Sequence, residues 1–530
     1  MNKYVLISLT DKNNLDVLMK NLKKHDYNVI ATTSTAKAIR EIGYDCQLVE
    51  DITSFPEMLG GRVKTLQPEI HGGILADLKQ ESHIEDLKKH DINPISLVVC
   101  NLYPFEQVIE REKQRHQEVV EKGSDKEIVD SLQQMDSDAI ENIDIGGVTL
   151  IRAASKNYKH VTLLCDPSDY EEYVQKLNDD ELTTEYRKTL AQKGFIHTAN
   201  YDSMIANFFM ETNDELEQLL VSAPLKKKLR YGENPYQEAY YFEDNKKSSY
   251  SMNTSQILQG KELSYNNLLD IDAAYHSIYE FDVPCAVALK HNTPCGIGFG
   301  QDLLEAYDAC YKVDPVSIFG GIVIFNGIVD QELAQKLNEI FLEIVIAPDF
   351  TKEALIEFSN KKNLRVIKGD FAKDRYQDYS MRSITGGYLY QFAKEENIEF
   401  EVVTKKTIDD ITKDNLLKLF KFVKNVKSNA IVIGQGNKVL GISGGMVSRI
   451  DASNFAISKA INNSEYNKDE PLILAGDAFF PFADIVDLAK QYNIKYLVHP
   501  GGSMNDDKVI AACDENDIAM AFTGIRYFKH

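Results

Sequence analysis

A continuous run of seven apolar residues at positions 283–289 leads directly into Lys290 and His291, and residues 294–300 are rich in glycine. A short apolar run bounded by turn residues is typical of a strand that is buried on both faces of a sheet. The glycine-rich segment favours a turn, and a helical pattern begins near Leu303. The sequence therefore predicts an α/β fold with Lys290 and His291 at the carboxyl end of a buried strand, where open α/β sheets bind ligands. A solvated lysine beside a structural histidine is the alternative.

Similar apolar runs alternate with amphipathic stretches along the whole chain, as βαβ units require. The runs at 4–9, 28–31, 97–100 and 161–165 predict strands of a first domain, and those at 430–433, 472–475 and 496–498 predict strands of a later one. Charged residues crowd positions 110–138, which we interpret as a solvated helical segment. Residues 211–228 change from acidic to basic and predict a domain boundary. No internal repeat is visible in the sequence.

The size and charge of the chain limit its class and its partners. Its 530 residues correspond to three or four domain-sized units, and its 43% hydrophobic and 26% charged residues are ordinary globular values. A net charge of −22 argues against nucleic acid or an anionic membrane as a general partner. No apolar run approaches the roughly 18 residues of a membrane span, and residues 1–9 do not resemble a leader. We therefore expect a cytoplasmic protein.

Several common site types have no support in the sequence. The seven cysteines are scattered and never form a C-x-x-C pair, which argues against a disulfide framework and a thiolate zinc site. The chain also lacks H-E-x-x-H and a Walker A sequence, and residues 296–300 miss the G-x-G-x-x-G spacing by one position. The common metal and dinucleotide sites are therefore not predicted.

Hydroxyl-rich segments follow two of the predicted strands in the first domain. They contain Thr10, Asp11 and Lys12, and then Thr32, Thr33, Ser34 and Thr35. Free backbone N–H groups and the helix dipole make such helix starts good anion sites, although ordinary N-capping is the alternative for each. Further on, two glycines are followed by a basic segment, Arg62, Val63, Lys64 and Thr65. This segment places a guanidinium, an ammonium and a hydroxyl within four residues, a set that suits a phosphate.

The segment 142–157 adds a further candidate in the same domain. Its adjacent glycines, Gly146 and Gly147, would let the backbone approach a ligand closely. Lys156 could then lie near the same pocket, and a surface lysine is the alternative.

Nine segments, in order along nearly the whole chain, resemble the bifunctional family of 5-aminoimidazole-4-carboxamide ribonucleotide (AICAR) formyltransferase / IMP cyclohydrolase. They are FPEMLGGRVKTL (55–66), CNLYPF (100–105), ENIDIGGVTLIRAASKN (141–157), LRYGENP (229–235), KHNTPCG (290–296), IFGGI (318–322), VKSNAI (426–431), DAFFPF (477–482) and HPGGS (499–503). The resemblance implies an α/β protein with a cyclohydrolase domain at 1–212, whose methylglyoxal-synthase-like core spans about 1–150. A linker at 213–228 and a formyltransferase domain at 229–530, made of two cytidine-deaminase-like α/β modules without zinc, complete the implied organisation.

The resemblance also implies residue roles in formyl transfer from 10-formyltetrahydrofolate, a cosubstrate, to AICAR, with no metal required. His291 matches the base, Lys290 its charge-stabilising neighbour, and Asn429 a donor to the same centre. Positions that match nucleotide-binding residues are Arg230, Tyr231, Gly320, Glu343, Arg449 and Arg526. Positions that match the folate site are Phe479, Asp484, Ser503 and Met504.

For ring closure of formyl-AICAR to IMP, the resemblance implies that Lys156 is the proton donor or acceptor and that Tyr103 and Asp144 orient the carboxamide. Positions that match nucleotide contacts are Thr10 to Lys12, Thr32 to Thr35, Arg62 to Thr65, Cys100, Asn101, Asp144 and Ile145. The family is dimeric, so we expect a homodimer whose formyltransferase sites draw Arg230, Lys290 and His291 from one subunit and Asn429, Arg449 and Arg526 from the other.

Four residues depart from the family pattern. Thr33 and Ser34 replace a glycine pair and would each cost roughly 1 kcal/mol if positive φ were required there. Met446 replaces a common glutamine, and Ala483 replaces a frequent arginine, so polar groups are lost near the folate site. Because of Thr33 and Ser34, the alternative function is a formyltransferase whose first domain is an inactive, nucleotide-binding regulatory module.

Overall fold

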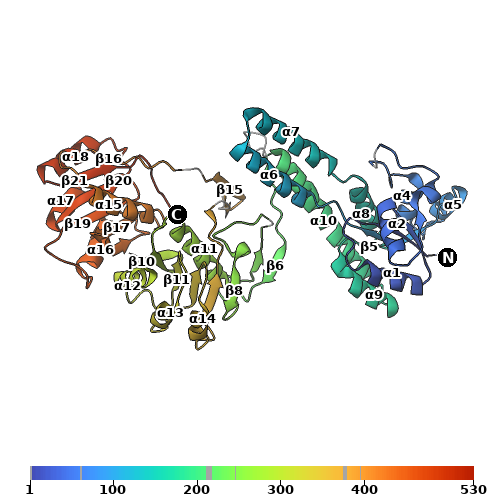
Figure 1. Ribbon diagram of the computed structural model, residues 1–530, viewed down its shortest axis with the longest axis horizontal. Helices are drawn as coiled ribbons and strands as arrows, with labels where there is room; N and C mark the ends of the chain where they lie inside the picture. Colours follow the sequence, from blue (N-terminus) through green and yellow to red (C-terminus); the bar gives the residue numbers. More distant parts are fainter. Residues whose placement is uncertain (1–2, 60–61, 211–217, 245, 374–378, 394–395) are drawn as a thin grey trace. The chain divides into compact units, whose positions relative to one another are not determined.

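The computed structural model describes residues 3–59, 62–210, 218–244, 246–373, 379–393 and 396–530. The chain forms two compact units, Met1–Ser222 and Ala223–His530. In Figure 1 the colours run along the chain from the blue start of unit 1 to the red end of unit 2.

Unit 1 contains a five-stranded parallel sheet. Its strands are β1 (Lys3–Ser8), β2 (Tyr27–Ala31), β3 (Gln47–Leu48), β4 (Ile95–Cys100) and β5 (Thr162–Leu164), in the order β3-β2-β1-β4-β5. All four strands predicted in this domain are therefore confirmed. The chain leaves β1 in one direction across the sheet and reaches β4 on its other side, which places a topological switch point between β1 and β4.

Helices cover both faces of this sheet. They are α1 (Leu15–Lys24), α2 (Thr33–Glu41), α3 (Val49–Thr53), α4 (Pro68–Leu75), α5 (Glu81–Lys89), α6 (Phe105–Lys122), α7 (Asp125–Glu141), α8 (Gly146–Lys156), α9 (Tyr170–Asn178) and α10 (Thr184–Met210). Alternate residues of β1 enter two separate cores: Val5 and Ile7 pack with α1, α2 and α9, and Leu6 packs with α4, α8 and α10. The charged segment 110–138 forms most of α6 and α7, as predicted.

Unit 2 contains the same arrangement twice. Repeat 1 runs α11 (Tyr265–Tyr279), β9 (Cys285–Lys290), β10 (Thr293–Phe299), α12 (Leu303–Val313), β11 (Ile322–Phe325), α13 (Gln331–Leu337), β12 (Ile344–Ala347), α14 (Lys352–Phe358) and β13 (Arg365–Lys368). Repeat 2 runs α15 (Asp410–Val423), β17 (Ile431–Gln435), β18 (Lys438–Ser443), α16 (Arg449–Ile461), β19 (Leu472–Gly476), α17 (Asp484–Gln491), β20 (Ile494–His499), α18 (Asp506–Glu515) and β21 (Ala519–Phe522).

The strand orders of the two repeats also agree. They are β10-β9-β11-β12-β13-β8 and β18-β17-β19-β20-β21-β16, with β8 (Gln256–Gln259) and β16 (Glu401–Val402) as antiparallel edges. The sequence showed no visible repeat, although the two halves of unit 2 share this strand order. Topology depends on where apolar runs and connections fall, and very different residues can supply the same pattern.

The structure corrects two details around the strand that carries Lys290. β9 is antiparallel to both of its neighbours, so its carboxyl end lies where the parallel strands β11, β12 and β13 begin. The glycine-rich segment is not a turn but strand β10. A Cβ on Gly296 would lie 2.4 Å from the carbonyl oxygen of Cys310, and one on Gly298 would lie 2.1 Å from that of Ala306. These glycines therefore serve the close packing of α12 on the strand.

One apolar cluster joins the two repeats. Buried residues of α11, β9 and β11 pack in the same cluster as those of α15, β17 and β19, while α12 to α14 and α16 to α18 cover the other faces of their own sheets. Between the repeats lies a hairpin of β14 (Tyr379–Ile384) and β15 (Gly387–Phe392).

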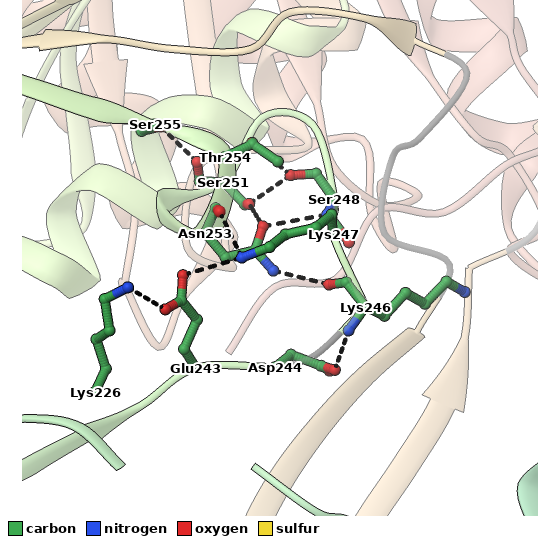
Figure 2. Close-up of polar contacts among 10 residues, drawn as sticks. All are labelled: Lys226, Glu243, Asp244, Lys246, Lys247, Ser248, Ser251, Asn253, Thr254 and Ser255. Carbon is green, nitrogen blue, oxygen red and sulfur yellow. Dashed lines mark hydrogen bonds and ion pairs between the residues drawn. The ribbon is translucent and has the colours of Figure 1, made fainter. Parts of the chain in front are cut away.

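The start of unit 2 differs from the predicted linker. Leu225–Lys228, which the sequence placed in the linker, form strand β6 and pair with β7 (Tyr240–Phe242). Beyond β7, Asn253 accepts hydrogen bonds from Ser248 N (3.1 Å) and Ser251 Oγ (2.7 Å), and Lys226 pairs with Glu243 at 2.7 Å (Figure 2). This polar network holds the segment that leads into repeat 1.

Candidate active sites

The first candidate site lies at the switch point of unit 1. Asn101 follows β4, and its Oδ1 accepts hydrogen bonds from the backbone N–H groups of Thr10 (2.7 Å) and Asp11 (3.1 Å), which follow β1. Its Nδ2 donates to the carbonyl oxygen of Asp11 at 2.8 Å. Lys12 lies next along the chain. The structure thus brings two of the predicted nucleotide segments together.

The hydroxyl-rich segment after β2 joins the same edge of the sheet. Thr35 Oγ1 accepts from the backbone N–H of Leu9 (2.9 Å) and from Thr32 Oγ1 (3.1 Å). Thr33 and Ser34 lie in the first turn of α2, and neither has positive φ. The strain considered for these two residues is therefore absent. The side chain of Thr32 does not cap α2, so it leaves the first backbone N–H groups of this helix available, as an anion site requires.

Asp144 lies before α8 and is held from two sides. Its Oδ1 accepts from the backbone N–H of Gly147 at 2.7 Å, and its own N–H donates to the hydroxyl of Tyr201 at 2.8 Å. Burial raises the pKa of Asp144, although hydrogen bonds from the backbone of Gly147 and Tyr103 and the charge of Lys64 act in the opposite direction. Sequence reasoning missed Tyr201, because it lies on a distant helix and carries no motif.

The basic segment lies close to Asp144. A Cβ on Gly146 would be 3.1 Å from Thr65 Oγ1, and Lys64 pairs with Glu57 at 3.4 Å. Arg62 pairs with Glu141, and Val63 forms an isolated bridge with Met58. The two glycines that precede Arg62 lie outside the described residues.

Two other predicted residues of unit 1 differ in accessibility. Burial raises the pKa of Cys100 well above its usual value, so this thiol stays protonated, and the residue has no exposed surface. Ile145 is exposed.

The structure does not bring Lys156 to this cluster. It is the last residue of α8, and a rise of about 1.5 Å per residue places it roughly 15 Å along the axis from Gly146. Lys156 instead borders a groove of about 540 Å³ together with Lys188, Phe195 and Ile196.

The second candidate site begins at the hairpin turn between β9 and β10. Lys290 pairs with Thr293, and the two residues between them, His291 and Asn292, both have positive φ (57° and 58°). Such a turn suits the twist of a hairpin, but it is costly for residues other than glycine or asparagine. Lys290 Nζ donates to the carbonyl oxygen of Phe319 at 2.8 Å, next to Gly320.

A half-buried carboxylate supports this turn, and further polar side chains pair near it. Asp270 on α11 accepts from the backbone N–H of Asn292 at 2.6 Å, and burial raises the pKa of this carboxyl. Glu343 accepts from Asn267 at 2.9 Å and pairs with Arg365 at 3.5 Å. Glu343 was predicted as a nucleotide-binding position, whereas Asp270, Asn267 and Arg365 had no motif in the sequence.

Arg230, which precedes repeat 1 in the chain, belongs to the same group of predicted nucleotide-binding residues. Its guanidinium stacks 5.7 Å from the ring centre of Tyr231, and its charge acts on Arg365 and Glu262. Five predicted residues thus lie at the edge where the parallel strands of repeat 1 begin: Lys290, His291, Gly320, Glu343 and Arg230.

The remaining predicted residues gather at the opposite edge of the equivalent sheet, where β18 to β21 end. Arg449 donates through NH2 to Asn429 Oδ1 (2.8 Å) and through NH1 to Asp477 Oδ1 (2.7 Å). Asn429 Nδ2 donates to the carbonyl oxygen of Met446 at 3.0 Å. Arg526 stacks 4.3 Å from the ring centre of Phe528.

The predicted folate residues lie on two loops at this edge and, for Asp484, at the start of α17. Asn505 donates to the carbonyl oxygen of Pro481 at 3.0 Å, which holds the loop with Phe479 and Asp484 beside the loop with Ser503 and Met504. Phe479 is partly buried, whereas Met504 is fully exposed. Ala483 precedes α17 and contributes no polar group.

Within the described residues, no hydrogen bond or ion pair links Lys290 or His291 to Asn429, Arg449 or Arg526. The same residues contain no group of three metal-ligating side chains. Across the described ranges, no helix is both long and apolar enough to cross a membrane.

Comparisons with known proteins agree with this arrangement. The model of the AICARFT/IMPCHase bienzyme family matches residues 154–459, and that of the MGS-like domain matches residues 14–149. The bifunctional purine biosynthesis proteins PurH of Lactobacillus delbrueckii subsp. bulgaricus, Oceanobacillus iheyensis and Persephonella marina are 42%, 40% and 43% identical to this chain, each over 100% of both chains. The chain therefore belongs to the AICARFT/IMPCHase bienzyme family, the bifunctional enzymes of purine biosynthesis.

Proposed function

We propose that unit 2 of this bifunctional enzyme transfers the formyl group of 10-formyltetrahydrofolate to AICAR, and that unit 1 closes formyl-AICAR to IMP. The observation that supports the first assignment best is the turn at Lys290 and His291, which presents an imidazole beside an anchored ammonium. The site at the switch point of unit 1 supports the second.

In formyl transfer, a bond forms between the AICAR amine and the formyl carbon, and the bond from that carbon to N10 of the folate breaks. The amine is a weak nucleophile because its carboxamide withdraws electrons, so removal of its proton by His291 during attack lowers the barrier. Lys290 and Asn429 stabilise the charge that develops on the formyl oxygen and the leaving folate. The proton then passes to N10.

The remaining residues of unit 2 bind the two substrates. The nucleotide is surrounded by Arg230, Tyr231, Gly320, Glu343, Arg449 and Arg526. The folate site is lined by Phe479, Asp484, Ser503 and Met504. The two repeats are cytidine-deaminase-like modules that work without zinc, and the chain acts in the cytoplasm.

Ring closure is intramolecular, so positioning and electrostatics contribute most to it. The nucleotide phosphate is bound by the starts of α2 and α8 and by the side chains of Lys64 and Thr65. The other nucleotide contacts are Thr10 to Lys12, Thr32 to Thr35, Arg62, Val63, Cys100, Asn101 and Ile145. Tyr103 and Asp144 orient the carboxamide.

The active assembly is a homodimer. The two clusters of unit 2 lie at opposite edges of equivalent sheets, and a two-fold dimer can join one cluster of each subunit to the other cluster of its partner. Lys156 is likewise too far from Asp144 to act on it within one chain, so a second copy supplies it to the cyclohydrolase site.

The test supplies the purified chain with AICAR and 10-formyltetrahydrofolate and follows tetrahydrofolate and IMP separately. Both products should form. Formyl-AICAR that accumulates without IMP would instead support a transferase with a regulatory first unit, and formation of neither product would contradict the proposal.

A further inference from the structure

Asp477 is a buried carboxylate that begins the DAFFPF segment and has no assigned role in the site. It follows β19 directly, and its side chain is fully buried. Oδ1 accepts from Arg449 NH1 at 2.7 Å, and Oδ2 accepts from Ser428 Oγ at 2.5 Å. A charged group with no exposure is costly unless it is paired and hydrogen-bonded, and both oxygens of Asp477 meet that condition.

Through these two bonds Asp477 connects the elements that carry the proposed catalytic amide. Ser428 precedes Asn429 in the chain, and Arg449 holds the oxygen of the Asn429 side chain at 2.8 Å. The C-terminal segment is tied to the same point, because Tyr527 N–H donates to the carbonyl oxygen of Asp477 at 2.9 Å. Arg526 is therefore adjacent to an anchored residue.

The network also fixes which way the Asn429 amide faces. A guanidinium can only donate, so the oxygen of the amide must face Arg449. The nitrogen then donates one N–H to the Met446 carbonyl oxygen at 3.0 Å and keeps its second N–H for a ligand. If Arg449 moved away, the amide would lose the contact that defines this orientation.

Repeat 1 shows what the fold requires at these positions. Asn326 follows β11 as Asp477 follows β19, and it also ties its strand to the start of the neighbouring one, because its Oδ1 accepts from Cys285 N–H at 2.9 Å. Leu303 begins α12 as Arg449 begins α16. The fold therefore accommodates a neutral pair at these positions.

The same comparison extends to the amide itself. The residue of repeat 1 equivalent to Asn429 is Pro284, which immediately precedes β9. Pro284 comes one residue before Cys285, which lies opposite Asn326. In the same way, Asn429 comes one residue before Ala430, which lies opposite Asp477. In repeat 1 these positions line a cavity of about 390 Å³. Only repeat 2 has the amide, the guanidinium and the carboxylate together.

Asp477 also balances the charge of Arg449. The charge of Arg449 also acts on His499, and this imidazole is neutral because burial and that charge lower its pKa to about 3. The carboxylate and guanidinium therefore form a net neutral pair, which is better suited to orienting a neighbour than to attracting an anion.

We propose that Asp477 is a positioning residue of the formyltransferase site, which holds Arg449 so that Arg449 fixes the Asn429 amide for catalysis. This inference rests on the proposed formyl transfer. It predicts a loss in kcat rather than in substrate affinity, because the misplaced N–H would act mainly on the charge that develops in the transition state.

The test compares three full-length variants with the parent enzyme. Asp477→Asn keeps the size of the side chain and removes its charge, and Arg449→Lys keeps the cation but is too compact to reach both partners. Each should lower kcat for formyl transfer about tenfold or more and leave cyclisation of formyl-AICAR unchanged. Asp477→Asn should change the AICAR KM by less than about threefold, whereas Arg449→Lys should also raise this KM because Arg449 is a proposed nucleotide contact. Ser443→Ala is the matched control, because Ser443 is buried at the same edge and its hydroxyl has no partner among the described residues.

Crystal structures of the parent enzyme and Asp477→Asn give a readout that does not depend on activity. The bond between Arg449 and Asn429 should be present in the parent and lost in the variant. If that bond persists, if kcat stays at the parent level, if only the AICAR KM rises, or if cyclisation falls equally, Asp477 is not a positioning residue. A parent enzyme that transfers no formyl group would contradict the proposed function, while the two crystal structures would still decide the role of Asp477.

Discussion

Asn101 and Asp11 are joined by a two-way contact, in which the Asn101 amide accepts from the Asp11 backbone N–H at 3.1 Å and donates to its carbonyl oxygen at 2.8 Å. The contact closes the switch point between β1 and β4, where the chain would otherwise leave two loop ends unlinked. It thus fixes two loop ends at the edge of the sheet where α/β folds bind ligands.

Replacing Asn101 by alanine should raise the KM for formyl-AICAR in cyclisation and lower the unfolding free energy by about 1–3 kcal/mol, since backbone groups of Thr10 and Asp11 lose their partner. Formyl transfer should not change. Asn157→Ala is the control. Like Asn101, Asn157 bonds to backbone groups of a distant segment, since it donates to two carbonyl oxygens at 2.7 and 2.9 Å. It follows the end of α8, however, whereas the candidate site lies at the start of that helix. Calorimetry and steady-state kinetics measure both effects, and an equal rise in KM for both variants would contradict the assignment.

Lys156→Ala should lower the kcat of cyclisation while nucleotide affinity stays near that of the parent, because Lys156 is the proposed proton donor or acceptor and is not a proposed phosphate contact. Lys188→Ala removes another lysine from the same groove and should have little effect. The supply of Lys156 by a second copy is tested by mixing Lys156→Ala with Asp144→Asn, which should restore cyclisation. If mixing restores nothing after subunit exchange, Lys156 does not act across the dimer.

Sequence patterns predicted the buried strands well, because an apolar run between turn residues leaves little choice of structure. They also located the loop ends that gather at the switch point of unit 1, since parallel strands bring their carboxyl ends to one edge. The same reasoning placed Lys290 and His291 correctly at the end of β9 but took β9 as an ordinary strand of an open sheet. Strand direction depends on pairing with distant segments, and local residues do not record it.

The residues that hold the site together were the hardest to predict. Asp477 follows a predicted strand and could have been noticed as a carboxylate at a strand end, but its partners Arg449 and Ser428 come from separate segments. The glycines of β10 suggested a turn because their purpose, the approach of α12, exists only in the folded protein. Contacts between distant elements thus account for what the sequence left open.

His291→Ala should lower formyl transfer by roughly 10²- to 10⁴-fold, the usual contribution of a general base, and leave cyclisation of supplied formyl-AICAR near normal. The cyclisation rate of the same preparation serves as the control for folding. A folded variant that keeps most of its transferase activity would remove His291 from the mechanism.

His499 should make the stability of unit 2 depend on pH. Its pKa is lowered to about 3 by burial and by the charge of Arg449, whereas an unfolded histidine has a pKa near 6.5. As the pH falls below about 6.5, only the unfolded chain gains this proton, so the unfolding free energy falls by about 1.4 kcal/mol per pH unit until about pH 3. Above that window the group has no effect.

His499→Asn should remove this contribution and keep an acceptor for the Gly501 N–H, which donates to His499 Nδ1 at 3.0 Å. Melting temperatures recorded from pH 7.5 to 4.5 should therefore fall more steeply for the parent than for the variant. Parallel curves would show that His499 does not titrate differently in the folded and unfolded chains.

Shared formyltransferase sites make a quantitative prediction for mixtures of inactive variants. His291→Ala and Arg526→Ala lie in separate clusters of unit 2, so a mixed dimer places both lesions in one site and leaves the other whole. With free exchange of equal amounts, about half of the dimers are mixed and about a quarter of all sites are intact. A site contained within one subunit predicts no recovery at any ratio. Transfer activity that stays at the level of the separate variants, after a tagged pull-down has verified exchange, would rule out the shared site.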